Sequence, residues 1–256
     1  MGKQFSETVN TIKMLQKITF LVVALASLSY ASKLPPYITA CKRDPATLTD
    51  CATKEARKIL PQFLNGDPSL KVPKLNPLKL PSVDINPGND LTLKLTEVII
   101  NGFEDHVIDL VAVDLNKHHI TIKMEFPRLN LISKYDINGQ LLVLPIRGSG
   151  PANITFVGSK FNFDSDFEEA TRGGETYLHL KDYKLSYTTE RIYVHLDNLF
   201  DGDSVLGPQV NKFLDENWME VDKELGPSIV KVINFVIKSI VDGVFNSIPM
   251  NQIFLP

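Results

Sequence analysis

The segment His195 to Trp218, HLDNLFDGDSVLGPQVNKFLDENW, concentrates carboxylates around two glycines, so it is the first place to look for chemistry. If Asp197 is taken as the first position of an EF-hand loop, Asp201 falls correctly at position five. Position three is then Leu199, and position twelve is Pro208, where calcium binding requires a bidentate glutamate. The sequence therefore does not predict a calcium loop here.

The same aspartates could instead supply an acid and a base, as in glycoside hydrolysis, but such carboxylates must flank a substrate cleft. In a loop with two glycines, Asp197, Asp201 and Asp203 are more typical of a solvated turn. Asp203 or Ser204 would then lie near the start of the following helix. We interpret the segment as a structural turn between a strand and a helix.

Other reactive patterns in the sequence are weak. Gly148-Ser149-Gly150 lacks the spacing of a G-x-S-x-G nucleophile elbow. His118 and His119 are adjacent in an apparent strand, so their side chains should point to opposite faces and would make a poor metal pair. We predict no catalytic residue, no metal and no cofactor. Asn153-Ile154-Thr155 is an N-glycosylation sequon, which is a candidate modification site.

The N-terminal segment has the features of a secretory signal peptide. Lys13 and Lys17 precede an apolar run from 18 to 27, and a Ser-x-Ala pattern ends at Ala31. The run is shorter than the about 20 residues that a membrane-spanning helix needs, although a retained signal anchor is an alternative. The chain could start at Met1 or at Met14.

From these features we predict a signal peptide over residues 1–31 and a single secreted domain over residues 32–256. Cys41 and Cys51 lie close together in the latter, and a secreted chain with an even number of cysteines favours a disulfide between them. The sequence has 27 Lys and Arg against 30 Asp and Glu, with a net charge of −3. Nucleic-acid binding, which needs a concentrated basic face, is not expected.

Alternation of apolar and polar residues predicts a long series of antiparallel strands in the middle of the chain. The predicted strands are 91–98, 120–126, 135–143, 161–167 and 192–196. Turn residues are expected at Asn101-Gly102, Asn138-Gly139, Gly148 to Gly150 and Gly173-Gly174. A helix is predicted over 51–64, which Pro61 could end early, and the proline-rich stretch 72–88 should form an edge or wrapping segment.

Two helices are predicted near the C-terminus, each opened by a Gly-Pro pair, at Gly207-Pro208 and at Gly226-Pro227. The second, of about 20 residues, is apolar over more than one face and must be largely enclosed. Lys231, Lys238 and Asp242 interrupt it and argue against a membrane span. We predict an α+β fold in which a long, highly curved antiparallel β-sheet is wrapped around a long C-terminal α-helix.

Longer stretches carry a specific resemblance. The string IYVHLDNLFDGDSVLGPQVNKFLDENW, the apolar helix after it and the ending FNSIPMNQIFLP resemble the insect takeout and juvenile-hormone-binding protein family. CKRDPATLTDC and LPQFLNGDPSLKVPKLNPLKL resemble another block of that family. The moth haemolymph juvenile hormone carriers have a second disulfide, for which this chain has no cysteines, so the chain is closer to the takeout branch.

The resemblance implies a secreted, extracellular carrier, in haemolymph or another extracellular fluid, with the takeout/TULIP-like wrapped fold and an apolar tunnel. The implied partner is a small hydrophobic ligand such as a terpenoid, a fatty acid or a similar lipid. Affinity would come from burial, at about 0.8 kcal/mol per buried methylene. We expect a monomer that is not an enzyme, does not bind nucleic acid and does not insert stably into membranes.

Candidate tunnel-lining residues come from the apolar strand faces and from the inward side of the helix, although ordinary core packing explains each of them equally well. They are Phe126, Leu131, Tyr135, Ile137, Leu141, Phe161, Phe163, Tyr187, Trp218, Val232, Phe235 and Val236. Tyr135 and Tyr187 could offer a hydroxyl to the polar head of a ligand.

Three alternatives remain open at the level of the sequence. One is a membrane-engaging lipid-transfer protein, which should show an exposed basic or aromatic tip. The second is a secreted modulator of feeding, circadian or courtship behaviour that acts through a receptor. The third is a secreted esterase, whose turnover should depend on Ser149 or His195.

Overall fold

The computed structural model describes residues 34–87 and 90–256. The predicted signal peptide and the choice between Met1 and Met14 lie outside the described residues. The described residues belong to one compact unit.

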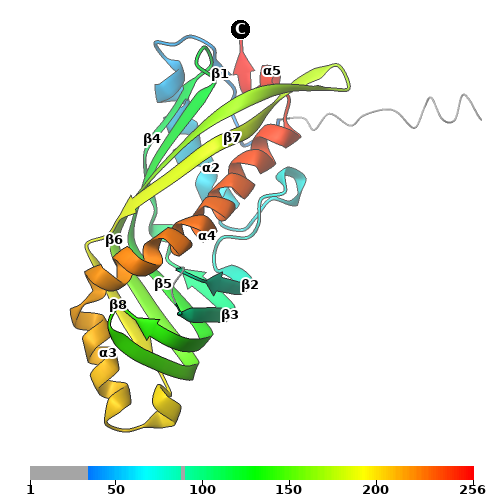
Figure 1. Cartoon of the computed structure of the whole chain (residues 1–256). Helices are drawn as coiled ribbons and strands as arrows, with labels where there is room; N and C mark the ends of the chain where they lie inside the picture. The colour runs from blue at the N-terminus through cyan, green and yellow to red at the C-terminus, as the bar shows by residue number, and fades with distance from the viewer. Residues whose placement is uncertain (1–33, 88–89) are drawn as a thin grey trace, which may run out of the picture. The chain divides into compact units, whose positions relative to one another are not determined.

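The framework of this unit is an antiparallel sheet, which in the described residues has seven strands in the path β2-β3-β5-β6-β7, with β4 beside β5 and β8 beside β6. Figure 1 shows the long central strands β5 and β6 and the shorter strands beside them. The strands are β2 Leu78–Ile85, β3 Thr92–Asn101, β4 Val107–Asp114, β5 His119–Leu141, β6 Leu144–Arg172, β7 Glu175–Thr188 and β8 Arg191–Leu196.

Helices and short segments cover this sheet. They are α2 Leu48–Phe63, η1 Pro68–Leu70, η2 Phe103–Asp105, η3 Phe200–Gly202, α3 Leu206–Glu216, α4 Trp218–Ser247 and α5 Met250–Ile253. Two very short strands, β1 Cys41–Lys42 and β9 Phe254–Leu255, pair in parallel. The expected large antiparallel sheet with a long C-terminal helix is therefore confirmed.

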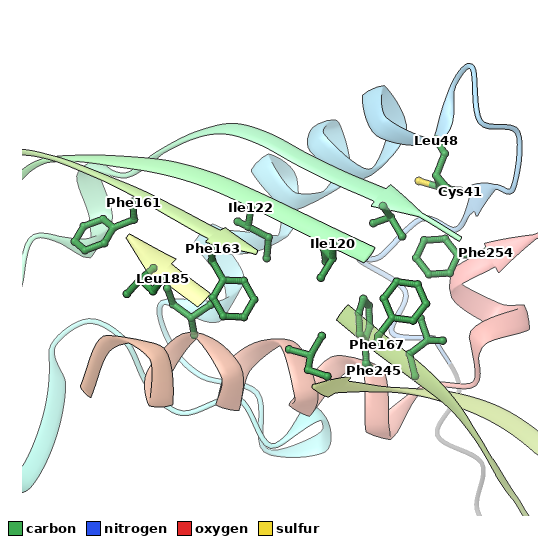
Figure 2. Packing of buried hydrophobic residues seen from close by; sticks show 14 of the residues in the cluster. Cys41, Leu48, Ile120, Ile122, Phe161, Phe163, Phe167, Leu185, Phe245 and Phe254 are labelled. Carbon is green, nitrogen blue, oxygen red and sulfur yellow. The ribbon is translucent and has the colours of Figure 1, made fainter. Parts of the chain in front are cut away.

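Helix α4 lies alongside β7 (Figure 1) and contacts both β7 and β2, which end the path of the sheet. The sheet is not closed on itself, and the apolar helix lies against both of its edges. Ile237 and Phe245 of α4 belong to one core cluster together with Phe163 and Phe167 of β6. Figure 2 shows Ile120, Phe163 and neighbouring side chains between the strands and the helix.

The two predicted strands 120–126 and 135–143 are largely one strand, β5, and the expected turns at Asn138-Gly139 and at Gly148 to Gly150 are wrong. These glycines serve close backbone approach instead. A Cβ on Gly139 would lie 2.1 Å from the carbonyl oxygen of Asp90, and one on Gly150 would lie 2.6 Å from that of Asp197. The turn residues Leu142 and Val143 lie between β5 and β6 instead.

Two of the predicted turns and the predicted edge segment are present, whereas two strands were missed. The turns at Asn101-Gly102 and Gly173-Gly174 do end strands β3 and β6, and the proline-rich stretch does contain the edge strand β2. Strands β4 and β7 were not predicted. β7 is an edge strand, and many of its side chains are exposed, which weakens the alternation that the prediction relied on.

The expectation that Gly226-Pro227 opens a helix is wrong, because both residues lie inside α4. A proline disfavours helical geometry in the preceding residue through a clash with its Cβ, and Gly226 has no Cβ. The helix break lies instead at Asn217, between α3 and α4. Pro61 likewise lies inside α2, which continues to Phe63.

Cys41 and Cys51 form the predicted disulfide, with their Cα atoms 5.8 Å apart. It joins β1 to helix α2. Beside it, the pair β1–β9 places Cys41 opposite Phe254, and the Arg43 side chain donates from Nε to the Phe254 carbonyl at 2.9 Å. We call this assembly of β1, β9 and the disulfide the terminal clasp.

Gly243 lets α4 approach η1 closely, since an added Cβ would lie 2.4 Å from the Leu70 carbonyl oxygen. We expect Gly243→Ala to lower the free energy of unfolding by about 1–3 kcal/mol, because the helix must shift to relieve the overlap. Urea denaturation measures this loss. Ser239→Ala, at a partly exposed site on the same helix, is the control and should change stability by less than about 0.5 kcal/mol. Equal stability of the two variants would contradict the prediction.

His119 pairs across β5 and β6 with acidic residues. Its Nδ1 lies 2.8 Å from Asp166 Oδ1, and its Nε2 lies 3.6 Å from Asp164 Oδ1. The hydrogen bond to Asp166 raises the pKa of His119 above its ordinary value of 6.5, and although burial opposes this rise, Asp164 adds to it. The stabilisation is thus fully present below pH 6.5 and is lost as pH rises through the folded-state pKa.

We therefore expect His119→Gln to lose more stability relative to the unmodified protein at a pH of about 5.5 than at about 8.5. Denaturation at both pH values measures the difference. His106→Gln is the control, because the His106 ring contacts the Phe103 carbonyl rather than a carboxylate. A His119→Gln loss that is the same at both pH values would refute the prediction.

Candidate ligand-binding cavity

A cavity of about 360 Å³ lies between α4 and the inner face of the sheet. This volume is within the range of about 300–1,000 Å³ that is common for small-molecule pockets. Helix α4 contributes residues at helical spacing, so that one side of the helix forms a continuous apolar wall. These residues are Ile229, Val232, Ile233, Val236, Ile237, Ile240, Val241, Val244 and Phe245.

The sheet supplies the opposite wall through the alternation of its strands, because every second residue of a strand faces the same side. In β5 the lining residues are Ile120, Ile122, Met124 and Phe126, followed by Leu129 and Leu131. The lining residues change from even to odd numbers after Phe126, next to Pro127, the one residue between Phe126 and Arg128 that has no partner in β6 although the register continues unchanged. Strand β6 adds Ile154, Phe156 and Phe161.

The third wall comes from α2 and from the segment that precedes β1. Leu34, Ile38 and Thr39 line the cavity together with one face of α2, which includes Ile59 and Phe63. The sequence predicted a helix over 51–64, but none of its residues was assigned to the cavity. Its spacing of small and apolar residues was the available signal.

Glu55 is a polar residue on this third wall. It accepts hydrogen bonds from the Thr39 backbone N–H at 3.0 Å and from Lys58 Nζ at 3.2 Å. Burial acts to raise the pKa of Glu55, but these hydrogen bonds outweigh it, so the pKa lies below its ordinary value. The carboxylate is therefore ionised and already paired within the protein.

Tyr187 of β7 forms another polar point on the wall. Its ring stacks on Phe161 with ring centroids 5.7 Å apart, and its hydroxyl donates a hydrogen bond to Asp222 of α4. Burial, followed by the contact with Asp222, raises the pKa of Tyr187 well above its ordinary value. Burial also raises the pKa of Asp222, while the hydrogen bond from Tyr187 acts to lower it. This pair joins the edge of the sheet to the helix.

Half of the predicted lining residues line the cavity, and their contact with a ligand stays a proposal. They are Phe126, Leu131, Phe161, Tyr187, Val232 and Val236. The cavity wall brings together residues that are far apart in the sequence, from β5, β6, β7 and α4.

The other predicted residues lie elsewhere. Tyr135, Ile137 and Leu141 share the inner face of β5 but belong to a second core cluster, which packs against α3 and the start of α4. The Tyr135 hydroxyl donates to the Asp197 carbonyl oxygen at 2.7 Å, so its proton is used within the protein. The sheet and the helices meet directly at this end, and these side chains fill the space between them.

Three further residues were expected in the wall and are not there. Phe163 is fully buried in the first core cluster. Trp218 is the first residue of α4, where the Arg191 guanidinium lies 5.7 Å from its ring. Phe235 is 69% exposed and is not among the lining residues, although the neighbouring Val232 and Val236 of the same helix line the cavity.

The acidic stretch from Asp197 to Asp203 forms a turn between β8 and α3, as expected, and η3 is part of it. Asp203 Oδ1 accepts hydrogen bonds from the backbone N–H groups of Val205 and Leu206, where α3 begins. Asp201 lies 3.6 Å from Arg147 at the surface. Across residues 34–87 and 90–256 no group of three His, Cys, Asp or Glu side chains is arranged to hold a metal ion. In the same residues no helix is both long and apolar enough to span a membrane.

Comparisons with known proteins agree with this architecture. The Epiphyas postvittana Takeout 1 crystal structure matches with a TM-score of 0.77 and 23% identity, over 86% of this chain and 100% of that chain, which shows a shared fold. "Circadian clock-controlled protein daywake" of Drosophila yakuba and that of Drosophila melanogaster are each 26% identical over 215 residues, which is 80% of this chain and 83% of theirs.

The model of the family described as haemolymph juvenile hormone binding protein (JHBP) matches residues 19–255. This match covers nearly the whole chain, including all three walls of the cavity. The resemblance seen in the sequence is confirmed: the chain belongs to the haemolymph juvenile hormone binding protein family.

Proposed function

We propose that this protein is a secreted, extracellular carrier that holds a small hydrophobic ligand in the cavity without chemically changing it. The observation that most directly supports this proposal is the cavity itself, whose walls consist almost entirely of aliphatic and aromatic side chains. An apolar ligand gains about 0.8 kcal/mol for each methylene that it buries. A terpenoid, a fatty acid or a similar lipid has the required chemistry, and family membership supports this class.

The proposal includes extension of the cavity into a tunnel when a ligand is bound. Val232 and Val236 lie one helical turn apart in the wall and would contact the length of a chain-like ligand. Tyr187 and Glu55 would contact more polar parts of it, although both already have partners within the protein.

A secreted esterase is less well supported. Ser149 and His195 are not among the residues that line the cavity, and the His195 ring lies 3.1 Å from Asp197 at the surface. The Drosophila relatives are named as circadian clock-controlled, which favours a link between this carrier and circadian timing. As a second role we propose that it modulates behaviour through a receptor. That role would use the same cavity to deliver the ligand.

Native mass spectrometry of protein secreted from insect cells, followed by solvent extraction, tests the proposal. We expect a stoichiometric hydrophobic molecule to travel with the protein. A protein that stays ligand-free after incubation with juvenile hormone, a long-chain fatty acid and a fluorescent apolar probe would overturn it.

Filling the cavity should abolish binding. We expect Val232→Trp to weaken the affinity for a fluorescent apolar probe at least tenfold, because the larger side chain occupies the space that the probe needs. Fluorescence titration measures the affinity. Phe235→Ala, on the exposed side of the same helix, is the matched control and should bind as the unmodified protein does. Equal affinities of the two variants would place the probe outside the cavity.

The Tyr187–Asp222 pair should give the stability a pH dependence. Because burial raises the folded-state pKa of Asp222 above its ordinary value of 3.8, the stability that its neutral form contributes is present below that value. It is lost as pH rises through the folded-state pKa. Asp222→Asn cannot ionise and still accepts from Tyr187, so we expect the variant to gain stability relative to the unmodified protein as pH rises from about 4 to 7.

Urea denaturation at several pH values measures this relative gain. Glu216→Gln is the control, because it removes an exposed carboxylate that pairs with Lys212 and lies outside the Tyr187–Asp222 pair. A difference between Asp222→Asn and the unmodified protein that does not change with pH would contradict the prediction.

A further inference from the structure

The outer face of the sheet carries the one N-x-Ser/Thr triplet of the sequence, Asn153-Ile154-Thr155, in the middle of β6. Strand β6 lies here between β5 and β8. The register places Ile132 of β5 and His195 of β8 directly opposite Asn153, one on each side. The next row on the same face contains Asn130, Thr155 and Tyr193.

This part of the sheet exposes apolar surface around Asn153. Ile132 is 45% exposed and Tyr193 is 48% exposed, although both lie in paired strands. Directly opposite side chains in antiparallel strands have Cβ atoms about 5 Å apart, and diagonal ones lie about 7–8 Å apart. Both side chains are therefore within reach of a group attached to Asn153. The Arg191 guanidinium lies 4.7 Å from the centroid of the Tyr193 ring and covers one of its faces.

The hydrogen bonds of Asn153 leave its reactive atom available. Its Oδ1 accepts from Asn130 Nδ2 at 2.7 Å, and the same nitrogen donates to Thr155 Oγ1 at 3.0 Å. The atom that carries a glycan is the other amide atom, Nδ2. The Asn153 side chain is exposed, so an attached sugar would meet solvent rather than the core.

We propose that Asn153 carries an N-linked glycan whose first sugar residues lie across the exposed side chains of Ile132 and Tyr193. The apolar C–H faces of the sugars would cover surface that is otherwise in contact with water. The modification requires passage through the secretory pathway and so rests on the secretion included in the proposed function.

The attachment is a substitution at C1 of the first sugar of a lipid-pyrophosphate-linked oligosaccharide, which that pathway supplies. Asn153 Nδ2 forms the new bond to C1, and the bond from C1 to the pyrophosphate oxygen breaks. The lipid pyrophosphate leaves with the bonding electron pair, and the amide loses one proton.

The glycan and the cavity lie on opposite sides of the sheet. Ile154, the next residue along β6, lines the cavity, and successive side chains of a strand point to opposite faces. Loss of the glycan should therefore leave probe binding unchanged. This independence separates the present proposal from the carrier function.

Intact-mass measurement of protein secreted from insect cells, before and after enzymatic removal of N-glycans, tests the attachment. We expect the protein without substitutions and the Thr155→Ser variant, which keeps the sequon, to lose the mass of an oligosaccharide on treatment. Asn153→Gln and Thr155→Ala should show no such loss. If the mass of the protein without substitutions does not change on this treatment, the proposal is overturned.

The position of the sugars is tested by the melting temperature. Removing the glycan should lower Tm by about 2–4 °C in the protein without substitutions. In a variant that combines Ile132→Ser and Tyr193→Ser, the decrease should be less than half as large. An equal decrease in both proteins would show that the sugars do not lie on these side chains, even if Asn153 is glycosylated. Probe titration of the same samples should give one affinity with and without the glycan.

Discussion

Burial of α4 is the interaction on which the rest of the structure depends. The helix is apolar over so much of its surface that it needs a partner on several sides, and an open sheet alone offers one face. Strand β7 at one end of the sheet and strand β2 at the other both contact the helix. The helix in turn satisfies an edge of the sheet, because Asp242 accepts a hydrogen bond from the Leu180 backbone N–H of β7.

The cavity follows from how unevenly this contact is filled. Near Tyr135 and Leu141 the side chains of the sheet meet α3 and the first turns of α4 directly. Farther along, valines and isoleucines of α4 face the phenylalanines and aliphatic residues of β5 and β6 across a space that they do not fill. Helix α2 and the segment before it close this space from the third side. A binding site for an apolar molecule thus arises from incomplete packing, without any reactive group.

The sequence was most informative where one physical rule governed a residue. Alternation in the predicted strands 120–126 and 135–143 correctly assigned Phe126 and Tyr135 to the inner face. Leu131 also lines the cavity, but it lies between those two predicted strands. The alternation could not show at which residue the helix moves away from the sheet, and this distance decides whether a side chain lines the cavity or fills the core.

The inward side of helix α4 was harder to predict, because its apolar residues cover more than one side. Phe235 and Val236 therefore looked equivalent, although one is exposed and the other lines the cavity. The glycines of β5 and β6 misled for a similar reason, since turns and close backbone contacts both select glycine.

The terminal clasp has a consequence for how the chain acquires its structure. The contact between Cys41 and Phe254 joins residues separated by almost the whole described chain, and such contacts carry the largest loop-closure cost. During synthesis, α2 and the strands leave the ribosome well before the helix and the strand that complete their packing. The inner face of the sheet must therefore remain without its helix until α4 has been made. The apolar side chains of the inner face are thus exposed in the nascent chain before α4 covers them. The cavity is completed only in the final steps of folding.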